Sequence, residues 1–230
     1  INSAIKEFDS IFVSNKRSKK IVEDIGNHNV IVVGDLRYDT VIPKLKNETN
    51  KIIERFIDDN NCIVFGSTWK EDENIIVKYI NNYKGNTKYI IAPHEIVKNS
   101  ERINKCLGSK SILFSKINSN TDLKEFSCLI IDNIGMLSSL YSYGTIAYVG
   151  GGMGTKGLHN ILEPAYFSKP IIIGKNYKGF DEAEKMIKNG NVISISNYSD
   201  FTNELELIIN NKSIIKEMSG KCTEFFKKNK

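Results

Sequence analysis

Residues 145–164 read TIAYVGGGMGTKGLHNILEP and join an apolar strand pattern, a glycine cluster and the expected start of a helix. Five glycines fall between positions 150 and 157. Glycine contributes no packing and costs conformational entropy, so such a cluster indicates backbone that comes close to another group or adopts a positive φ. A strand, a glycine-rich turn and a helix N-terminus together present free N–H groups and a positive dipole end. The stretch therefore predicts a phosphate site at the end of a strand.

Short β-branched runs alternate with helical patterns along the whole chain. The expected strands are residues 11–13, 30–33, 62–65, 89–92, 112–114, 128–131, 145–149, 170–173 and 192–195. The expected helices are roughly residues 15–25, 48–59, 71–83, 95–107, 134–143, 159–167, 180–189 and 199–217. Strands that are apolar on both faces and separated by amphipathic helices favour a parallel sheet covered on both sides. The predicted fold is a Rossmann-like, doubly wound α/β sheet.

The domain organisation is read from the first quarter of the chain. Residues 34–47 combine glycine, proline and polar positions and are predicted to be a linker. Residues 1–33 form a βαβ pattern that we assign to the end of a preceding domain, and residues 48–230 form the main domain. The chain does not begin with methionine, so we expect it to start inside a longer protein.

The composition is that of a globular domain, with 40% hydrophobic and 26% charged residues among 230. Its apolar runs are too short to span a bilayer, and its first residues lack a signal-peptide pattern, so we expect a soluble fragment. The net charge is +5. The terminal basic clusters are interpreted as solvated surface or, alternatively, as a membrane-surface contact, and no motif favours nucleic acid. The four widely spaced cysteines predict reduced core positions.

Polar side chains and glycines follow three of the expected strands. In a parallel sheet the carboxyl ends of neighbouring strands lie at one edge, so we expect these turns to converge on one cleft. The predicted binding residues are Gly66, Ser67, Thr68, Pro93, His94, Glu95, Gly150, Gly151, Gly152, Met153, Gly154, His159, Asn160 and Glu163. A metal is not expected, because neither an Asp-x-Asp pair nor a zinc-type spacing is present.

Each of these motifs has a structural alternative. Thr68 and Glu71 would also form a capping box at a helix start. Trp69 would be either a core wedge or a wall for a base or sugar ring. His94 would equally serve a structural hydrogen bond, and Glu163 would equally sit in a solvated first turn where it favours the helix dipole. The GxGxxG pattern at 152–157 lacks the acidic residue that a dinucleotide site requires after the next strand, so nicotinamide or flavin is disfavoured.

Taken together, the turns resemble those of the 3-deoxy-D-manno-octulosonic acid (Kdo) transferases of lipopolysaccharide synthesis. The matching segments are GDLRYDTV (34–41), FGSTWKEDE (65–73), IIAPHEI (90–96), IDNIGMLSSLYSYGTIAYVGGGMGTKGLHNILEPAYFSKPIIIG (131–174) and NYKGFDEAEKMIKNG (176–190). The ordered set PHE, GGG and HNILEP is much more specific than any of its pieces. The resemblance implies a GT-B glycosyltransferase, in which two Rossmann-like domains face a cleft and no metal holds the nucleotide sugar.

The resemblance further implies that this chain is the C-terminal half, which binds the donor CMP-Kdo. The acceptor would be a lipid A precursor at the cytoplasmic face of the inner membrane, and transfer would invert the anomeric centre. A glutamate general base would lie upstream of Ile1, so the fragment alone is expected to be inactive. Gly66–Thr68 and Gly150–Gly154 would surround the phosphate and the Kdo carboxylate.

The remaining expected contacts concern charge and the ribose. His94 would help to neutralise the phosphate, with Lys156 as a second candidate, while Asn160 and Glu163 would hold the cytidine ribose. Two alternatives stay open: another GT-B protein that uses a UDP-sugar, either a hexosyltransferase or an epimerase, and a non-catalytic nucleotide-sugar-binding module.

Overall fold

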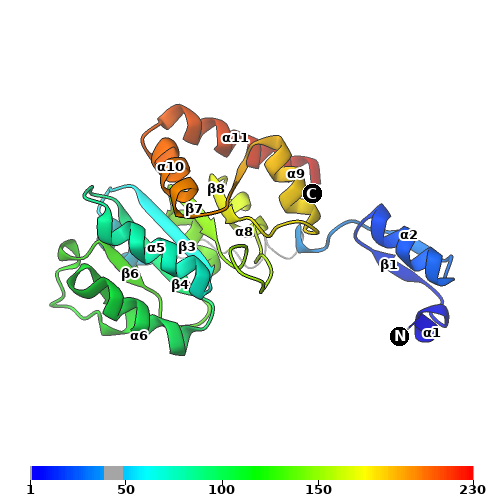
Figure 1. The fold of residues 1–230 in the computed structure, drawn as a ribbon, viewed down its shortest axis with the longest axis horizontal. Coiled ribbons are helices and arrows are strands. Elements are labelled where there is room, and N and C mark those ends of the chain that lie inside the picture. The colour runs from blue at the N-terminus through cyan, green and yellow to red at the C-terminus, as the bar shows by residue number, and fades with distance from the viewer. Residues whose placement is uncertain (1, 39–48, 230) are drawn as a thin grey trace. The chain divides into compact units, whose positions relative to one another are not determined.

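The computed structural model describes residues 2–38 and 49–229, and its contacts divide the chain into two units, Ile1–Lys44 and Leu45–Asn229 (Figure 1). Most of the predicted linker, residues 39–47, lies outside the described residues. The smaller unit contains α1 (Asn2–Lys6), β1 (Ile11–Val13), α2 (Lys16–Ile25) and β2 (Val30–Val32).

The smaller unit is a βαβ element. Strand β1 pairs with β2 in parallel, with Ile11 opposite Val30. The helix between them begins where the Asn15 side chain accepts a hydrogen bond from the Ser18 amide, and it ends at Gly26, whose φ is 107°. The βαβ pattern expected from the sequence is therefore present, while its assignment to a preceding domain stays a prediction.

The larger unit is built on one parallel sheet of seven strands in the order β5-β6-β4-β3-β7-β8-β9. The strands are β3 (Cys62–Thr68), β4 (Lys88–Pro93), β5 (Ser111–Leu113), β6 (Cys128–Ile130), β7 (Ile146–Val149), β8 (Ile171–Gly174) and β9 (Val192–Ile195). Every residue of β4, β6, β7 and β8 is buried. Burial on both faces explains why these strands read as continuous apolar runs, and the predicted Rossmann-like α/β fold is confirmed.

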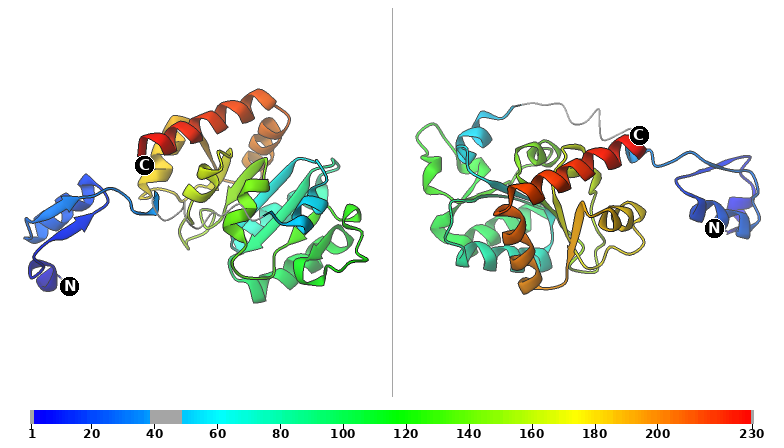
Figure 2. Two further views of the ribbon diagram at one scale, coloured as in Figure 1. Left: turned by 180° about the vertical axis from the view of Figure 1, so that it is seen from behind. Right: turned by 90° about the horizontal axis from the view of Figure 1, so that it is seen from above.

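The helices of this unit are α4 (Lys51–Ile57), α5 (Lys70–Asn82), α6 (Ile96–Leu107), α7 (Leu137–Leu140), α8 (Leu162–Tyr166), α9 (Asp181–Asn189), α10 (Tyr198–Ile209) and α11 (Lys212–Asn229). One core joins alternate strand residues such as Phe65 and Tyr148 to residues of α5, α6 and α10. Helix α11 packs on α8, α9 and α10 (Figure 2).

Three expected helices differ from the structure. The expected helix at 134–143 is reduced to α7 (Leu137–Leu140) and a 3-10 turn at Tyr141–Tyr143. The expected helix at 199–217 is two helices, because the side chain of Asn211 accepts hydrogen bonds from the amides of Ser213 and Ile214 and so starts α11. The expected helix at 159–167 begins only at Leu162. His159 and Asn160 consequently lie in the loop before that helix.

The order of the strands defines where a ligand would bind. From the central strand β3 the chain moves to β4 on one side and later returns to β7 on the other. In doubly wound sheets a crevice forms beyond the carboxyl ends of the strands at such a switch point. The turn after β3 contains Gly66–Thr68 and the turn after β7 contains the glycine cluster, so the two strongest motifs lie at this position.

Candidate functional site

The three polar turns are joined through their backbones. The Gly150 amide donates to the Gly66 carbonyl at 2.9 Å, and the His94 amide donates to the Thr68 carbonyl at 2.9 Å. These bonds continue the registers that place Gly66 opposite Val149 and Thr68 opposite Pro93. The structure therefore brings together the turns that the sequence places at one sheet edge.

Close backbone contacts account for part of the glycine cluster. A Cβ at Gly150 would lie 2.3 Å from the Ser67 carbonyl oxygen, and a Cβ at Gly174 would lie 2.2 Å from the Gly152 carbonyl carbon. Gly151 has a φ of 94°, a conformation that side chains rarely adopt. The cluster is thus needed for packing of the turns against each other, whatever else it binds.

The start of α5 differs from the predicted capping box. Helix α5 has Trp69 as its N-cap, and the Trp69 amide donates to Oδ2 of Asp72 at 2.9 Å. Thr68 instead donates through Oγ1 to Oε1 of Glu73 at 3.2 Å. Ser67, just before, has a φ of 51° where the register between β3 and β4 shifts. The pairing resumes with Thr68 opposite Pro93, and the strand ends there, directly before Trp69 caps the helix.

The Asp72 carboxylate accepts one of the backbone amides that were predicted to face the phosphate. This carboxylate is fully buried; Oδ2 accepts the Gly151 amide at 2.9 Å in addition to that of Trp69, and Oδ1 accepts the Tyr148 hydroxyl at 2.7 Å. Burial raises the pKa of Asp72, and these hydrogen bonds oppose the rise. The expectation that all amides of Gly150–Gly154 face a ligand is corrected here, because those of Gly150 and Gly151 bind protein acceptors.

The backbone amides of the glycine turn that have no protein acceptor in the described part of the chain lie further along the turn. Among the described residues, the amides of Gly152 and Gly154 donate to no protein acceptor. The turn is held from its other side by Asn176, whose amide donates to the Gly152 carbonyl at 2.8 Å and whose side chain donates to the Gly154 carbonyl at 2.7 Å. These bonds fix the Gly152–Met153 and Gly154–Thr155 peptide units, which lie on either side of the peptide unit that carries the Gly154 amide.

Three aromatic rings stack beside this turn. The ring centroids of Trp69 and His94 are 4.4 Å apart, those of His94 and His159 are 4.5 Å apart, and those of Trp69 and His159 are 6.2 Å apart. The Lys156 ammonium lies 5.2 Å from the Trp69 ring centroid. Trp69 is half-buried and does not belong to the core cluster that contains Phe65 and Tyr148, so its role as a wall for a base or sugar ring stays a prediction.

Asn160 and Glu163 lie next to each other at the start of α8. Asn160 Nδ2 donates to Oε1 of Glu163 at 3.4 Å, and its Oδ1 accepts the Leu162 amide at 3.1 Å. Burial raises the pKa of Tyr141, whose hydroxyl would meet a Cβ at Gly66, and the charge on Glu163 raises it further. Asn160 therefore has a structural role, and Glu163 lies within electrostatic reach of the turn after β3.

Glu73 is a further acidic group behind the site that the sequence analysis did not single out. Its side chain is fully buried and pairs with Arg102. Burial raises the pKa of Glu73 to about 7, against the opposing effects of Arg102 and Thr68. Like Asp72, it belongs to the EDE run at 71–73, which reads in sequence as an exposed, charged first turn of a helix.

The raised pKa of Glu73 predicts a pH-dependent contribution to stability. A carboxyl whose folded pKa is raised stabilises the fold below its ordinary value of 4.5, and this contribution is lost as the pH rises through about 7. We expect Glu73→Gln to become more stable relative to the wild type as the pH rises through this interval. Urea unfolding of both proteins across it measures the difference, and Glu125→Gln corrects for the change in net charge. A difference that is constant with pH would contradict the assignment.

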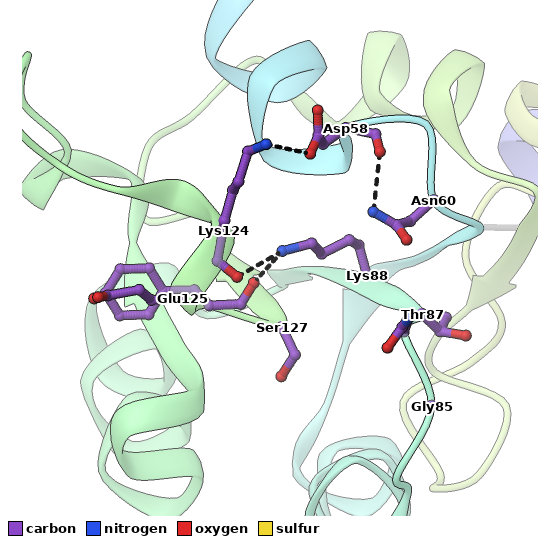
Figure 3. A pocket seen from close by; sticks show the side chains of 10 residues that line it. Asp58, Asn60, Gly85, Thr87, Lys88, Lys124, Glu125 and Ser127 are labelled. Atoms are coloured by element: carbon purple, nitrogen blue, oxygen red, sulfur yellow. Dashed lines mark hydrogen bonds and ion pairs between the residues drawn. The ribbon is translucent and has the colours of Figure 1, made fainter.

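A separate pocket lies at the opposite edge of the sheet, near the amino ends of β4 and β6 (Figure 3). Its volume is about 310 Å³, and it contains none of the predicted site residues. Buried Lys88 donates through Nζ to the carbonyls of Leu123, Lys124 and Phe126, the last at 2.6 Å. The amine therefore ties down the turn before β6, which is a structural role.

The four cysteines differ in their burial. Cys62, Cys128 and Cys222 are buried, whereas Cys106 is exposed, so the expectation of a core position is wrong for Cys106.

Within residues 2–38 and 49–229, no group of three His, Cys, Asp or Glu side chains is arranged to hold a metal ion. None of the helices in these ranges is long and apolar enough to span a bilayer.

Comparison with known proteins gave relatives that match most of the chain. No family model matches it. The 3-deoxy-D-manno-octulosonic acid transferase of Rickettsia typhi is 27% identical over 216 residues, which is 92% of this chain and 46% of the relative. The chain spans about half the length of the curated relatives that it matches first. Several relatives of this name match, so the predicted resemblance to Kdo transferases is confirmed.

Solved structures share the fold. The C-terminal CMP-Kdo binding domain of WaaA from Acinetobacter baumannii superposes with a TM-score of 0.65 at 16% identity, over 83% of this chain and 98% of that domain. Anabaena Alr3699/HepE, solved in complex with UDP-glucose, superposes with a TM-score of 0.60 at 12% identity, over 99% of this chain and 61% of that protein. At these identities the structures support the architecture alone.

Proposed function

We propose that this chain is the donor-binding part of a glycosyltransferase and that its donor is CMP-Kdo. The observation that carries the proposal is the sequence similarity to Kdo transferases over 92% of the chain, which includes all three turns at the switch point. The site supports it chemically, because it combines amide donors, a lysine and two histidines with a carboxylate beside them. Such a set suits a nucleotide that carries a phosphate and a ribose.

The anionic part of the donor would lie over the glycine turn. In this proposal the amides of Gly152 and Gly154 donate to the phosphate or to the Kdo carboxylate, and Ser67 lines the opposite wall. Thr68 is fully buried and its hydroxyl donates to Glu73, so it supports this wall from behind. Lys156 and His94 stand beside the turn and would offset the negative charge that builds on the departing CMP. Donors that are already oriented stabilise developing charge without reorganising.

The ribose would lie against α8. Glu163 would accept hydrogen bonds from the ribose hydroxyls, and Asn160 would hold the carboxylate in place through its bond at 3.4 Å. Pro93 and Glu95 flank His94, and Met153 lies between the two donor glycines; we propose that these three shape the site without a charge-assisted bond.

The whole protein would transfer Kdo to a lipid A precursor with inversion, at the cytoplasmic face of the inner membrane. Its general base would be a glutamate outside this chain, so the chain alone is expected to bind the donor without transferring it. Residues 1–33 would then be the end of the acceptor domain, with 34–47 as the connection. Joining this chain to the remaining part of a full-length relative and assaying Kdo transfer tests this extension.

A UDP-sugar is the second candidate donor, since Anabaena Alr3699/HepE was solved with UDP-glucose and shares the fold. Calorimetry of this chain with CMP, followed by competition with UDP, separates the two. We expect CMP to bind and UDP to compete poorly. Preferential binding of UDP would overturn the CMP-Kdo assignment in favour of a hexosyltransferase or an epimerase. Binding of neither would overturn the donor site.

Glu163→Gln is expected to weaken CMP binding by at least about tenfold, because a hydrogen bond to a charged group contributes roughly 1.5–3 kcal/mol. The amide keeps the shape of the side chain and loses the charge. Calorimetric titration with CMP measures the change. Glu125→Gln is the matched control, since Glu125 is exposed at the opposite edge of the sheet and should leave the affinity unchanged. Equal affinities for wild type and Glu163→Gln would remove Glu163 from the ribose site.

A further inference from the structure

The hydrogen bond between Trp69 and His159 fixes which ring nitrogen of the histidine carries a proton. The indole Nε1 of Trp69 lies 2.8 Å from Nε2 of His159. An indole nitrogen is a donor only, so Nε2 of His159 must accept with its lone pair. A histidine whose Nε2 accepts is neutral, and its hydrogen is on Nδ1.

We infer that Trp69 is a positioning residue that holds His159 as the neutral Nδ1–H tautomer, so that His159 offers the donor nucleotide an uncharged hydrogen-bond donor. This inference deepens the proposed function and rests on it where the nucleotide is concerned. The edge of the ring that carries Cδ2 faces Gly151, 3.1 Å from the position of a Cβ there. Nδ1 lies on the other side of the ring and forms no hydrogen bond with any described residue, which leaves it available to a ligand.

The surroundings of the ring also favour the neutral form. The His94 ring centroid lies 4.5 Å from that of His159, with the two ring planes tilted by 33°. The Lys156 ammonium lies over Trp69, 5.2 Å from its ring centroid. Two nearby acids have other neighbours: Asp72 accepts the Gly151 amide, and the Glu71 carboxyl carbon lies 3.0 Å from the position of a Cβ at Gly154. Burial lowers the pKa of His159, and His94 lowers it further.

This arrangement divides two tasks within the stack. Lys156 and exposed His94 can supply positive charge, while His159 supplies an oriented hydrogen-bond donor that carries no charge. The Nδ1–H group donates its hydrogen bond without a charge on the ring. His159 should therefore contribute to nucleotide affinity without being protonated to the imidazolium form, which is unusual for a histidine beside an anion.

The first test needs no ligand. Nitrogen-15 NMR of the histidine rings at neutral pH reports which nitrogen is protonated, and the chain has only three histidines, so His28→Gln and His94→Gln assign the spectrum. We expect His159 to show a protonated Nδ1 and an unprotonated Nε2. Protonation at Nε2 in the wild type would overturn the inference, and this result is independent of whether CMP binds.

The second test uses Trp69→Phe, which keeps an aromatic ring in the stack and removes the donor. We expect Nε2 of His159 to take up a proton in this variant, and CMP affinity to increase more steeply than in the wild type as the pH falls, by up to about tenfold per pH unit for one added proton. The pH dependence of the phosphate itself is common to both proteins and cancels in their ratio. Identical pH profiles and an unchanged tautomer in Trp69→Phe would overturn the role of Trp69.

Discussion

Asp72→Ala is expected to lower the free energy of unfolding by at least about 3 kcal/mol, because three buried donors lose their acceptor and each such loss costs roughly 1–3 kcal/mol. The donors are the amides of Trp69 and Gly151 and the hydroxyl of Tyr148. Alanine provides no acceptor in their place, and the carboxylate is fully buried, so water does not readily replace it. Urea denaturation followed by circular dichroism measures the loss.

Tyr148→Phe provides the graded control. It removes one of the three hydrogen bonds and leaves the carboxylate bound to both amides, so we expect a loss of only about 1 kcal/mol. Asp72→Asn should fall between the two variants, because an amide side chain retains one acceptor oxygen. If Asp72→Ala destabilised no more than Tyr148→Phe, the carboxylate would not be the group that holds the turns together.

Asp72→Ala should also lose CMP binding, measured by calorimetry under conditions where the variant is folded. Asp72 links the turn after β3 to the turn after β7 across 79 positions of sequence. Without that link the amides of Gly152 and Gly154 are no longer fixed relative to Ser67 and Thr68. Wild-type affinity in folded Asp72→Ala would show that the glycine turn is positioned by other contacts.

Gly150→Ala is the second large effect. Its Cβ would lie 2.3 Å from the Ser67 carbonyl oxygen and 2.7 Å from the Thr68 Cα, and both atoms belong to the backbone. A flexible side chain cannot move aside to make room here, so two strand ends must separate, and we expect a loss of about 3 kcal/mol or more. Thermal and urea unfolding measure it, and we expect CMP affinity to fall as well.

Gly220→Ala is the matched control for this substitution. Gly220 lies inside α11, and a Cβ there would meet no atom within 4 Å. Because alanine is the better helix former, this variant should gain roughly 0.5–1 kcal/mol. The opposite signs of the two glycine-to-alanine changes separate crowding from backbone entropy. A stable Gly150→Ala protein would contradict the tight contact between the turns after β3 and β7.

The sheet could be predicted from the sequence because its strands are local, apolar and separated by clear turn signals. Every expected strand in residues 49–229 is present, with ends that differ by at most three residues from the expectation. The order of the strands could not be predicted, because it depends on contacts between distant segments such as Ile63 opposite Ile146. The switch point, which locates the site, is therefore a result of the structure.

The sequence analysis did not single out Asp72, because its role also depends on contacts between distant segments. In sequence it stands between Glu71 and Glu73, where acidic residues commonly favour the positive end of a helix. Only the approach of Tyr148 in β7 and of Gly151 in the turn after it makes Asp72 a buried acceptor. Conversely, the glycine cluster is a strong local signal that does not distinguish tight packing from ligand binding, and the structure shows packing at Gly150 and Gly174.

The position of Trp69 has a practical consequence, since it is the only tryptophan in the chain. Its indole stacks on His94 and donates to His159, so its emission arises entirely from the stacked wall of the site. A nucleotide bound at the proposed site would displace solvent from the indole or alter its histidine neighbours, and either event would change the fluorescence. Collections of unlabelled nucleotide sugars can thus be screened optically against the unmodified chain.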